Sequence, residues 1–156
     1  MTLQDYLPCL YALLACAGFA VMFEIKKPMF ILLASATGMV SWLVFLLLHD
    51  IGSEVARYFL ATMVAALFAE TFARLMKAPA TIFLVIGIVP LVPGGGLYYA
   101  MDALIGGNYA LFAERGLDTA AFAAAIAAGV SVVTSIVRMA MTGRMNRRER
   151  ETEKEE

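Results

Sequence analysis

The stretch Ile88-Val-Pro-Leu-Val-Pro-Gly-Gly-Gly-Leu-Tyr-Tyr99 decides the fold, because it places two prolines and three consecutive glycines inside an apolar run. Proline removes a backbone donor and clashes with the preceding helical turn, and glycine adds conformational freedom. A continuous helix is therefore not expected here. Apolar sequence extends from Thr81 to about Ile105, so we predict one long helical segment that is broken near Pro93 to Gly96.

The chain around this stretch is too apolar for a water-soluble domain. Of its 156 residues, 62% are hydrophobic and 16% are charged, whereas soluble domains are about half apolar and about a quarter charged. The lipid bilayer is therefore the expected solvent for most of the chain. The formal net charge of -1 argues against a nucleic-acid-binding protein, which would carry a basic surface.

Five apolar stretches can each approach the roughly 20 residues that a membrane-spanning helix needs. They cover about residues 7–23, 29–48, 58–75, 81–105 and 119–141. We predict an all-α polytopic membrane protein of about five transmembrane helices, of which the fourth is broken at the Pro/Gly motif. In this interpretation residues 1–143 form a single transmembrane domain, residues 144–156 form a charged cytoplasmic tail, and residues 106–118 form a loop.

Basic residues indicate the orientation in the membrane. They cluster in the first and third connections and in the tail, at Lys26, Lys27, Arg74, Lys77, Arg144, Arg147, Arg148, Arg150 and Lys154. Because cytoplasmic loops carry an excess of lysine and arginine, these segments are expected in the cytoplasm and the N-terminus outside. No basic segment precedes the first apolar run, so we interpret that run as a retained helix and not as a signal peptide.

The predicted break is also the best candidate for a substrate site. Pro90 lies ~13 Å beyond Thr81 at ~1.5 Å per residue, close to the middle of a bilayer core of ~30 Å. Irregular backbone at that depth requires surrounding protein or a water-filled cavity. A half-helix starting near Gly95 would direct its N–H groups at a carboxylate. The predicted substrate-binding residues are Pro90, Pro93, Gly94, Gly95, Gly96 and Tyr98. The alternative is a proline kink that simply packs against neighbouring helices.

Glu70 is the one carboxylate inside an apolar stretch, and such residues are functional candidates. Arg74 follows four residues later on the same helical face, so the two side chains can form an ion pair. We therefore name Glu70 and Arg74 as candidates for ion coupling or gating. A purely structural ion pair is the alternative.

Small residues recur every four positions in the last apolar stretch, at Ala123, Ala127, Ser131 and Ser135. Small residues allow helix backbones to approach closely in a bilayer. This face is expected to pack either within the chain or in an oligomer.

The sequence contains no constellation that indicates an enzyme, a cofactor or a metal. Cys9 and Cys16 would lie ~10 Å apart along one helix, too far for a disulfide, and we interpret them as inert buried residues. His49 is the only histidine, which argues against a metal site. Neither a nucleophile–base pair nor a nucleotide-binding motif is present in the sequence.

Two segments resemble the threonine/serine exporter family. They are Ala69-Glu-Thr-Phe-Ala-Arg-Leu-Met-Lys-Ala-Pro-Ala-Thr-Ile-Phe83 and Val89-Pro-Leu-Val-Pro-Gly-Gly-Gly-Leu-Tyr-Tyr99. The similarity is to the C-terminal membrane half of the family, which also occurs as a separate small subunit. It extends to about Met139 and is most specific in the proline–glycine core.

The resemblance implies a subunit of a secondary exporter in the bacterial cytoplasmic membrane. Its substrates would be threonine, serine or similar small polar carboxylates. It also implies a partner subunit that carries the N-terminal half of the exporter. From the small-residue face we further predict an oligomeric assembly in membrane lipid. Two alternatives remain: a channel-like pore assembled from this chain alone, and a membrane scaffold that stabilises a partner without transporting.

Overall fold

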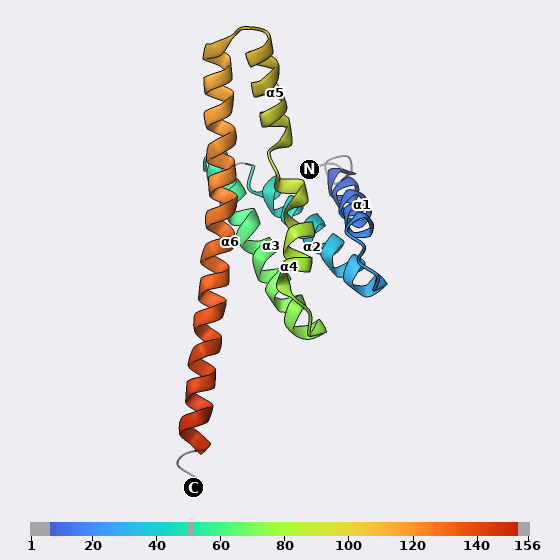
Figure 1. Ribbon diagram of the computed structural model, residues 1–156, viewed down its shortest axis with the longest axis vertical. Coiled ribbons are helices and arrows are strands. Elements are labelled where there is room, and N and C mark those ends of the chain that lie inside the picture. The colour runs from blue at the N-terminus through green and yellow to red at the C-terminus, as the bar shows by residue number, and fades with distance from the viewer. Residues whose placement is uncertain (1–6, 50–51, 153–156) are drawn as a thin grey trace.

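The computed structural model describes residues 7–49 and 52–152 (Figure 1). The helices in this part are α1 (Leu7–Met22), α2 (Pro28–Leu47), α3 (Glu54–Met76), α4 (Ala80–Ile88), the short 3₁₀ helix η2 (Val89–Leu91), α5 (Gly94–Ile105) and α6 (Tyr109–Thr152). No strand occurs within these residues. The prediction of an all-α fold is therefore confirmed.

Three helices are long and apolar enough to cross a membrane: α2, α3 and the part of α6 from Tyr109 to Met141. The segment Ala80–Leu91 and helix α5 qualify together as a fourth span that is bent by 52°. Helix α1 has 16 residues and reaches only ~24 Å at ~1.5 Å per residue, short of a ~30 Å bilayer core. The chain is therefore a polytopic membrane protein with three to four candidate spans, and the predicted fifth is not confirmed.

Local sequence explains where the central helices begin and end. Pro28 occupies the first turn of α2, where its missing N–H removes no helical hydrogen bond. Ser53 caps α3 by accepting a hydrogen bond of 3.4 Å from the N–H of Ala56. Lys77 ends α3 in the left-handed conformation with a φ of 51°.

The prediction of a loop over residues 106–118 is wrong, because α6 already begins at Tyr109. Asn108 caps this helix: its side-chain oxygen accepts a hydrogen bond of 3.1 Å from the N–H of Leu111. Only a tight turn remains between α5 and α6, and Gly107 adopts a φ of 76° in it. Helix α6 continues to Thr152, so the backbone of the expected tail begins as a helix. The division at residues 143 and 144 stays a prediction.

The helices form a bundle with a protruding hairpin (Figure 1). Helix α2 packs against α1, α3 and α4, and α3 packs against α4 and α6. Helix α5 and the N-terminal part of α6 pack against each other as a hairpin that stands out beyond α1–α4. The break between α4 and α5 therefore lies where the bundle gives way to the hairpin.

The small-residue face of α6 points away from the rest of the chain. All four of its residues are exposed: Ala123, Ala127, Ser131 and Ser135. The buried positions lie about half a turn away, at Ala125, Ile126, Gly129 and Val133. Helix α6 approaches α3 closely at Gly129, where an added Cβ would lie 2.8 Å from the carbonyl oxygen of Phe59. The prediction that this face packs within the chain is therefore wrong, because α6 packs against α3 through a different face, the one that contains Gly129.

Candidate functional site

The break consists of the 3₁₀ turn and two further non-helical residues, Val92 and Pro93, between α4 and α5. Helix α4 ends at Ile88, Val92 is extended with φ -62° and ψ 124°, and α5 begins at Gly94. The three glycines therefore form the first turn of α5, and the irregular backbone precedes them. The predicted break is observed, with its centre a few residues earlier than Pro93 to Gly96.

Two buried side chains lie against carbonyl groups next to the break. Pro90 has no N–H to donate to the carbonyl of Ile86, which accepts a hydrogen bond from the N–H of Val89 instead. The Cys16 thiol lies 3.4 Å from the Ile86 oxygen and donates to it. The Ser41 hydroxyl lies 2.9 Å from the Gly87 oxygen and 2.8 Å from the Gly38 oxygen, and donates to one or the other.

These contacts explain how irregular backbone survives in an apolar environment. Cys16 and Ser41 have no exposed surface, and lipid-compatible breaks require such internal partners. Gly38 allows this closeness, because a Cβ there would collide with the Cys16 sulfur. Cys16 is a buried free cysteine, as expected, and in addition contacts the backbone next to the break, whereas Ser41 was not identified from the sequence. No local signal could identify either residue, since the helical register between α1, α2 and α4 decides which side chains meet the break.

A cleft of about 410 Å³ opens beside the break. Residues from α2, α3, α5, α6 and the break line it: Trp42, Glu54, Tyr58, Pro90, Val92, Pro93, Gly94, Gly95, Gly96, Tyr99, Arg115, Asp118, Thr119 and Phe122. The structure thus brings five of the six predicted substrate-binding residues together. The sixth, Tyr98, does not line the cleft and is 67% exposed, whereas its neighbour Tyr99 does line it. One residue along a helix turns the side chain by about 100°, which accounts for the different positions of the two rings. A role of Tyr98 in substrate binding stays a prediction.

The cleft carries charges of both signs. Glu54 lies in the first turn of α3, while Arg115 and Asp118 lie one turn apart on α6. Within the part of the chain that the structure describes, none of the three makes an ion pair. The amides of Gly95 and Gly96 belong to the first turn of α5, whose N–H groups lack partners inside the helix. The walls therefore offer anionic, cationic and N–H groups to a ligand.

A second cavity, of about 310 Å³, lies on the side of the break that faces α1. Its lining is almost wholly apolar: Pro8, Tyr11, Ala12, Ala15, Trp42, Val89 and Pro90. Trp42 and Pro90 line both this cavity and the charged cleft. The charged cleft and the apolar cavity therefore adjoin at these two residues.

The break lies off-centre in the bundle. The fully buried Leu91 clusters with Phe45 in the last turn of α2, Ala61 in the second turn of α3, and Ile126 of α6. The break is thus closer to the end where α2 leads into α3 than to the middle of these helices. The break was expected near the middle of the bilayer because only the number of residues from Thr81 was considered. The position of α4 along its neighbouring helices could not be read from that number.

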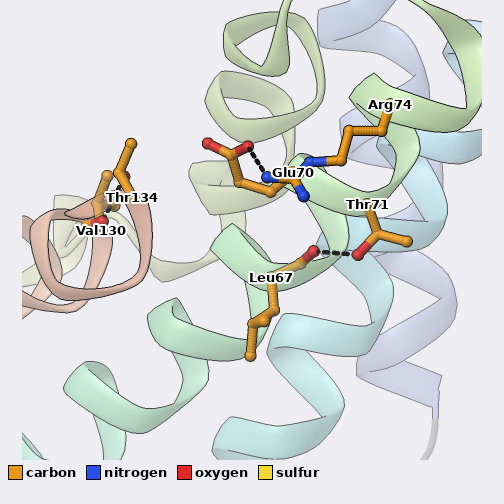
Figure 2. Close-up of polar contacts among 6 residues, drawn as sticks. All are labelled: Leu67, Glu70, Thr71, Arg74, Val130 and Thr134. Atoms are coloured by element: carbon orange, nitrogen blue, oxygen red, sulfur yellow. Dashed lines mark hydrogen bonds and ion pairs between the residues drawn. The ribbon is translucent and has the colours of Figure 1, made fainter. Parts of the chain in front are cut away.

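The predicted pair on α3 is present but lies outside the cleft. The Arg74 Nη2 and Glu70 Oε2 atoms are 3.6 Å apart (Figure 2). The Glu70 side chain is 18% exposed and that of Arg74 is 43% exposed. Neither residue lines the charged cleft or the apolar cavity. Their role in coupling or gating stays a prediction.

Comparison with known proteins identifies one family. The family model described as "Threonine/Serine exporter, ThrE" matches residues 8–136. No curated protein and no solved structure gives a significant match. The matched region includes α1 from Pro8 onward, α2 to α5, both prolines of the break, the three glycines and every residue of the cleft. The chain therefore belongs to the threonine/serine exporter family.

Proposed function

We propose that the chain is the C-terminal membrane half of a secondary exporter, working as a separate subunit. It moves threonine, serine or a similar small polar carboxylate out of the cell, and a partner subunit supplies the N-terminal half. The family match supports an exporter-type transport subunit and makes a transporter the better interpretation than an enzyme.

The observation that carries this proposal is the cleft at the broken span. Its volume of about 410 Å³ falls in the range of small-molecule sites. The N–H groups at Gly95 and Gly96 and the guanidinium of Arg115 suit the substrate carboxylate. Glu54 and Asp118 suit an ammonium group. This combination fits a zwitterionic amino acid better than a dicarboxylate, because a dicarboxylate would face two uncompensated acidic side chains.

The arrangement of the helices supports five crossings with alternating direction (Figure 1). Helix α1 packs along α2, and a short helix can span if the bilayer thins locally. The bent pair α4 and α5 would form the fourth crossing. From the basic connections we infer that the C-terminus lies in the cytoplasm and the N-terminus outside, in a bacterial cytoplasmic membrane. Glu70 and Arg74 are the coupling or gating candidates of this proposal.

The exposed small-residue face of α6 supports assembly with another helix. Ala123, Ala127, Ser131 and Ser135 are all exposed, and small faces are typical of helix contacts in membranes. The partner subunit or a second copy of this chain could provide that helix. The second possibility keeps the self-assembled pore as an alternative.

Flux into vesicles separates these functions. Purified chain is reconstituted with and without the partner subunit, and uptake of radiolabelled threonine, serine and succinate is measured. The proposal expects uptake of the two amino acids only when both subunits are present. Uptake with this chain alone would indicate the pore. No uptake by a folded two-subunit complex would indicate the scaffold and refute the exporter.

A further inference from the structure

Trp42 is the only tryptophan of the chain, and its ring is held firmly in place. It stacks on Phe45 with ring centroids 5.3 Å apart and an interplanar angle of 22°. Phe45 in turn packs against Tyr58, and Tyr58 against Phe122, each at 4.7 Å. Aromatic contacts thus connect α2 through α3 to α6 and fix the position of the indole.

The indole N–H of Trp42 is buried without an acceptor. Its Nε1 atom is shielded from solvent, and no hydrogen-bond partner exists for it among the residues that the structure describes. Buried polar groups are nearly always paired, because an unpaired donor destabilises the folded protein. A phenylalanine would supply a stacking ring without this cost. The unpaired donor therefore requires an explanation other than packing.

The position of Trp42 supplies that explanation. With Pro90, it lines both the charged cleft and the apolar cavity. A solute that moves from one cavity to the other would pass these two residues. The unpaired N–H is then a donor that such a solute could meet.

We propose that Trp42 contacts the substrate as it crosses between the two cavities, and that its indole N–H donates a hydrogen bond to the substrate carboxylate. This inference rests on the proposed function, since it requires a carboxylate-bearing substrate that moves through the chain. The N–H is closed off in the present conformation and finds its acceptor during transport. The unpaired N–H of Trp42 thus lowers the stability of the folded chain, and the same group provides a contact to the substrate.

The first test is Trp42→Phe, which keeps an aromatic ring and removes the N–H. Export of radiolabelled threonine is measured in cells that contain the partner subunit, and is expressed per amount of folded protein. We expect export to fall about tenfold or more, as for the loss of one hydrogen bond to a charged group. Tyr109→Phe is the matched control, because it removes a polar atom from a ring that lines neither cavity. It should export at the wild-type rate. Wild-type export by Trp42→Phe, or a loss that only follows the amount of folded protein, overturns the inference.

The second test observes the indole directly in the full chain, together with its partner, in lipid. Because this chain has one tryptophan, selective labelling of this subunit gives a single indole N–H resonance. Titration with threonine should shift it downfield, and threoninol, which lacks the carboxylate, should not. No shift with threonine, or an equal shift with threoninol, overturns the inference. If wild-type protein exports threonine but the resonance does not respond, the proposed function stands and the inference fails. If no amino acid is exported or shifts the resonance, both fail.

Discussion

The two ends of α3 carry the same kind of side chain in different surroundings. At the start of the helix, Glu54 lines the charged cleft and makes no ion pair with any residue that the structure describes. Four turns later, Glu70 pairs with Arg74 on its own helix at 3.6 Å. The sequence made Glu70 the stronger functional candidate because it lies inside an apolar stretch. The structure makes Glu54 the one that is available to a ligand.

The backbone differs between the two ends in the same way. Around Glu70 the helix is regular and its side-chain hydroxyls bond to their own helix, as Thr71 does to the carbonyl of Leu67 at 2.7 Å (Figure 2). Near Glu54 the neighbouring backbone is broken, and Pro90, Val92 and the glycines of the break line the same cleft. Polar groups that pair within one helix stabilise that helix, whereas polar groups without a partner at a helix break can bind a solute.

Filling the charged cleft beside the start of α3 should produce the largest effect on export. An added Cβ at Gly95 meets nothing within 4 Å, whereas one at Gly96 would lie 2.6 Å from the Thr119 hydroxyl oxygen. Gly95→Leu should therefore abolish threonine export by filling the cleft, while the protein stays inserted and folded. Gly96→Leu should lose export together with the contact between α5 and α6. Export and thermal stability in detergent measure both. Normal export by Gly95→Leu would remove the cleft from the transport path.

Deleting a donor at the break should have the next largest effect. Ser41→Ala removes the hydroxyl that lies 2.9 Å from the Gly87 oxygen of α4, and the expected loss is about 1–3 kcal/mol of unfolding free energy. Ser35→Ala is the matched control: Ser35 is also buried, but it bonds to Ile31 of its own helix at 2.7 Å. Its loss should be smaller, because a helical carbonyl keeps its backbone partner. Equal losses for the two variants, measured by denaturant titration in detergent, would contradict the assignment of Ser41 to the break.

The charge of Glu54 should control selectivity more than stability. Glu54→Gln removes a group that suits the substrate ammonium, so threonine export should fall about tenfold relative to succinate, equivalent to about 1.4 kcal/mol. Glu114→Gln removes the same charge from an exposed residue of α6 that does not line the cleft. Competition between labelled threonine and succinate in vesicles measures the ratio. An unchanged ratio in Glu54→Gln would refute the ammonium site.

The sequence predicted the parts of this comparison that depend on local chemistry. Two prolines within four residues must interrupt a helix, and glutamate and arginine four residues apart on a helix can pair. What it could not predict depends on helix register. Glu54, Arg115 and Asp118 are up to 64 positions apart in the chain and meet because the hairpin of α5 and α6 places them beside the start of α3. Tyr99 replaces Tyr98 in the cleft for the same reason, since only the rotation of α5 decides which ring faces it.

Neutralising the ion pair of Glu70 and Arg74 near the end of α3 should have the smallest effect on export. An exposed pair four residues apart on a helix contributes about 0.3–0.5 kcal/mol, and the Arg74 side chain is 43% exposed. Glu70→Gln keeps the shape of the side chain and leaves Arg74 unpaired. If the pair is structural, as its geometry favours, a small loss of export follows and Arg74→Gln partly restores it, because the two residues interact directly. A coupling role has a different signature: Glu70→Gln would change the pH dependence of export, and neutralising Arg74 would not restore it. Wild-type flux in Glu70→Gln at every pH would exclude coupling through this carboxylate. The contrast with Glu54 would then be complete, because only the unpaired acidic residue of α3 would affect transport.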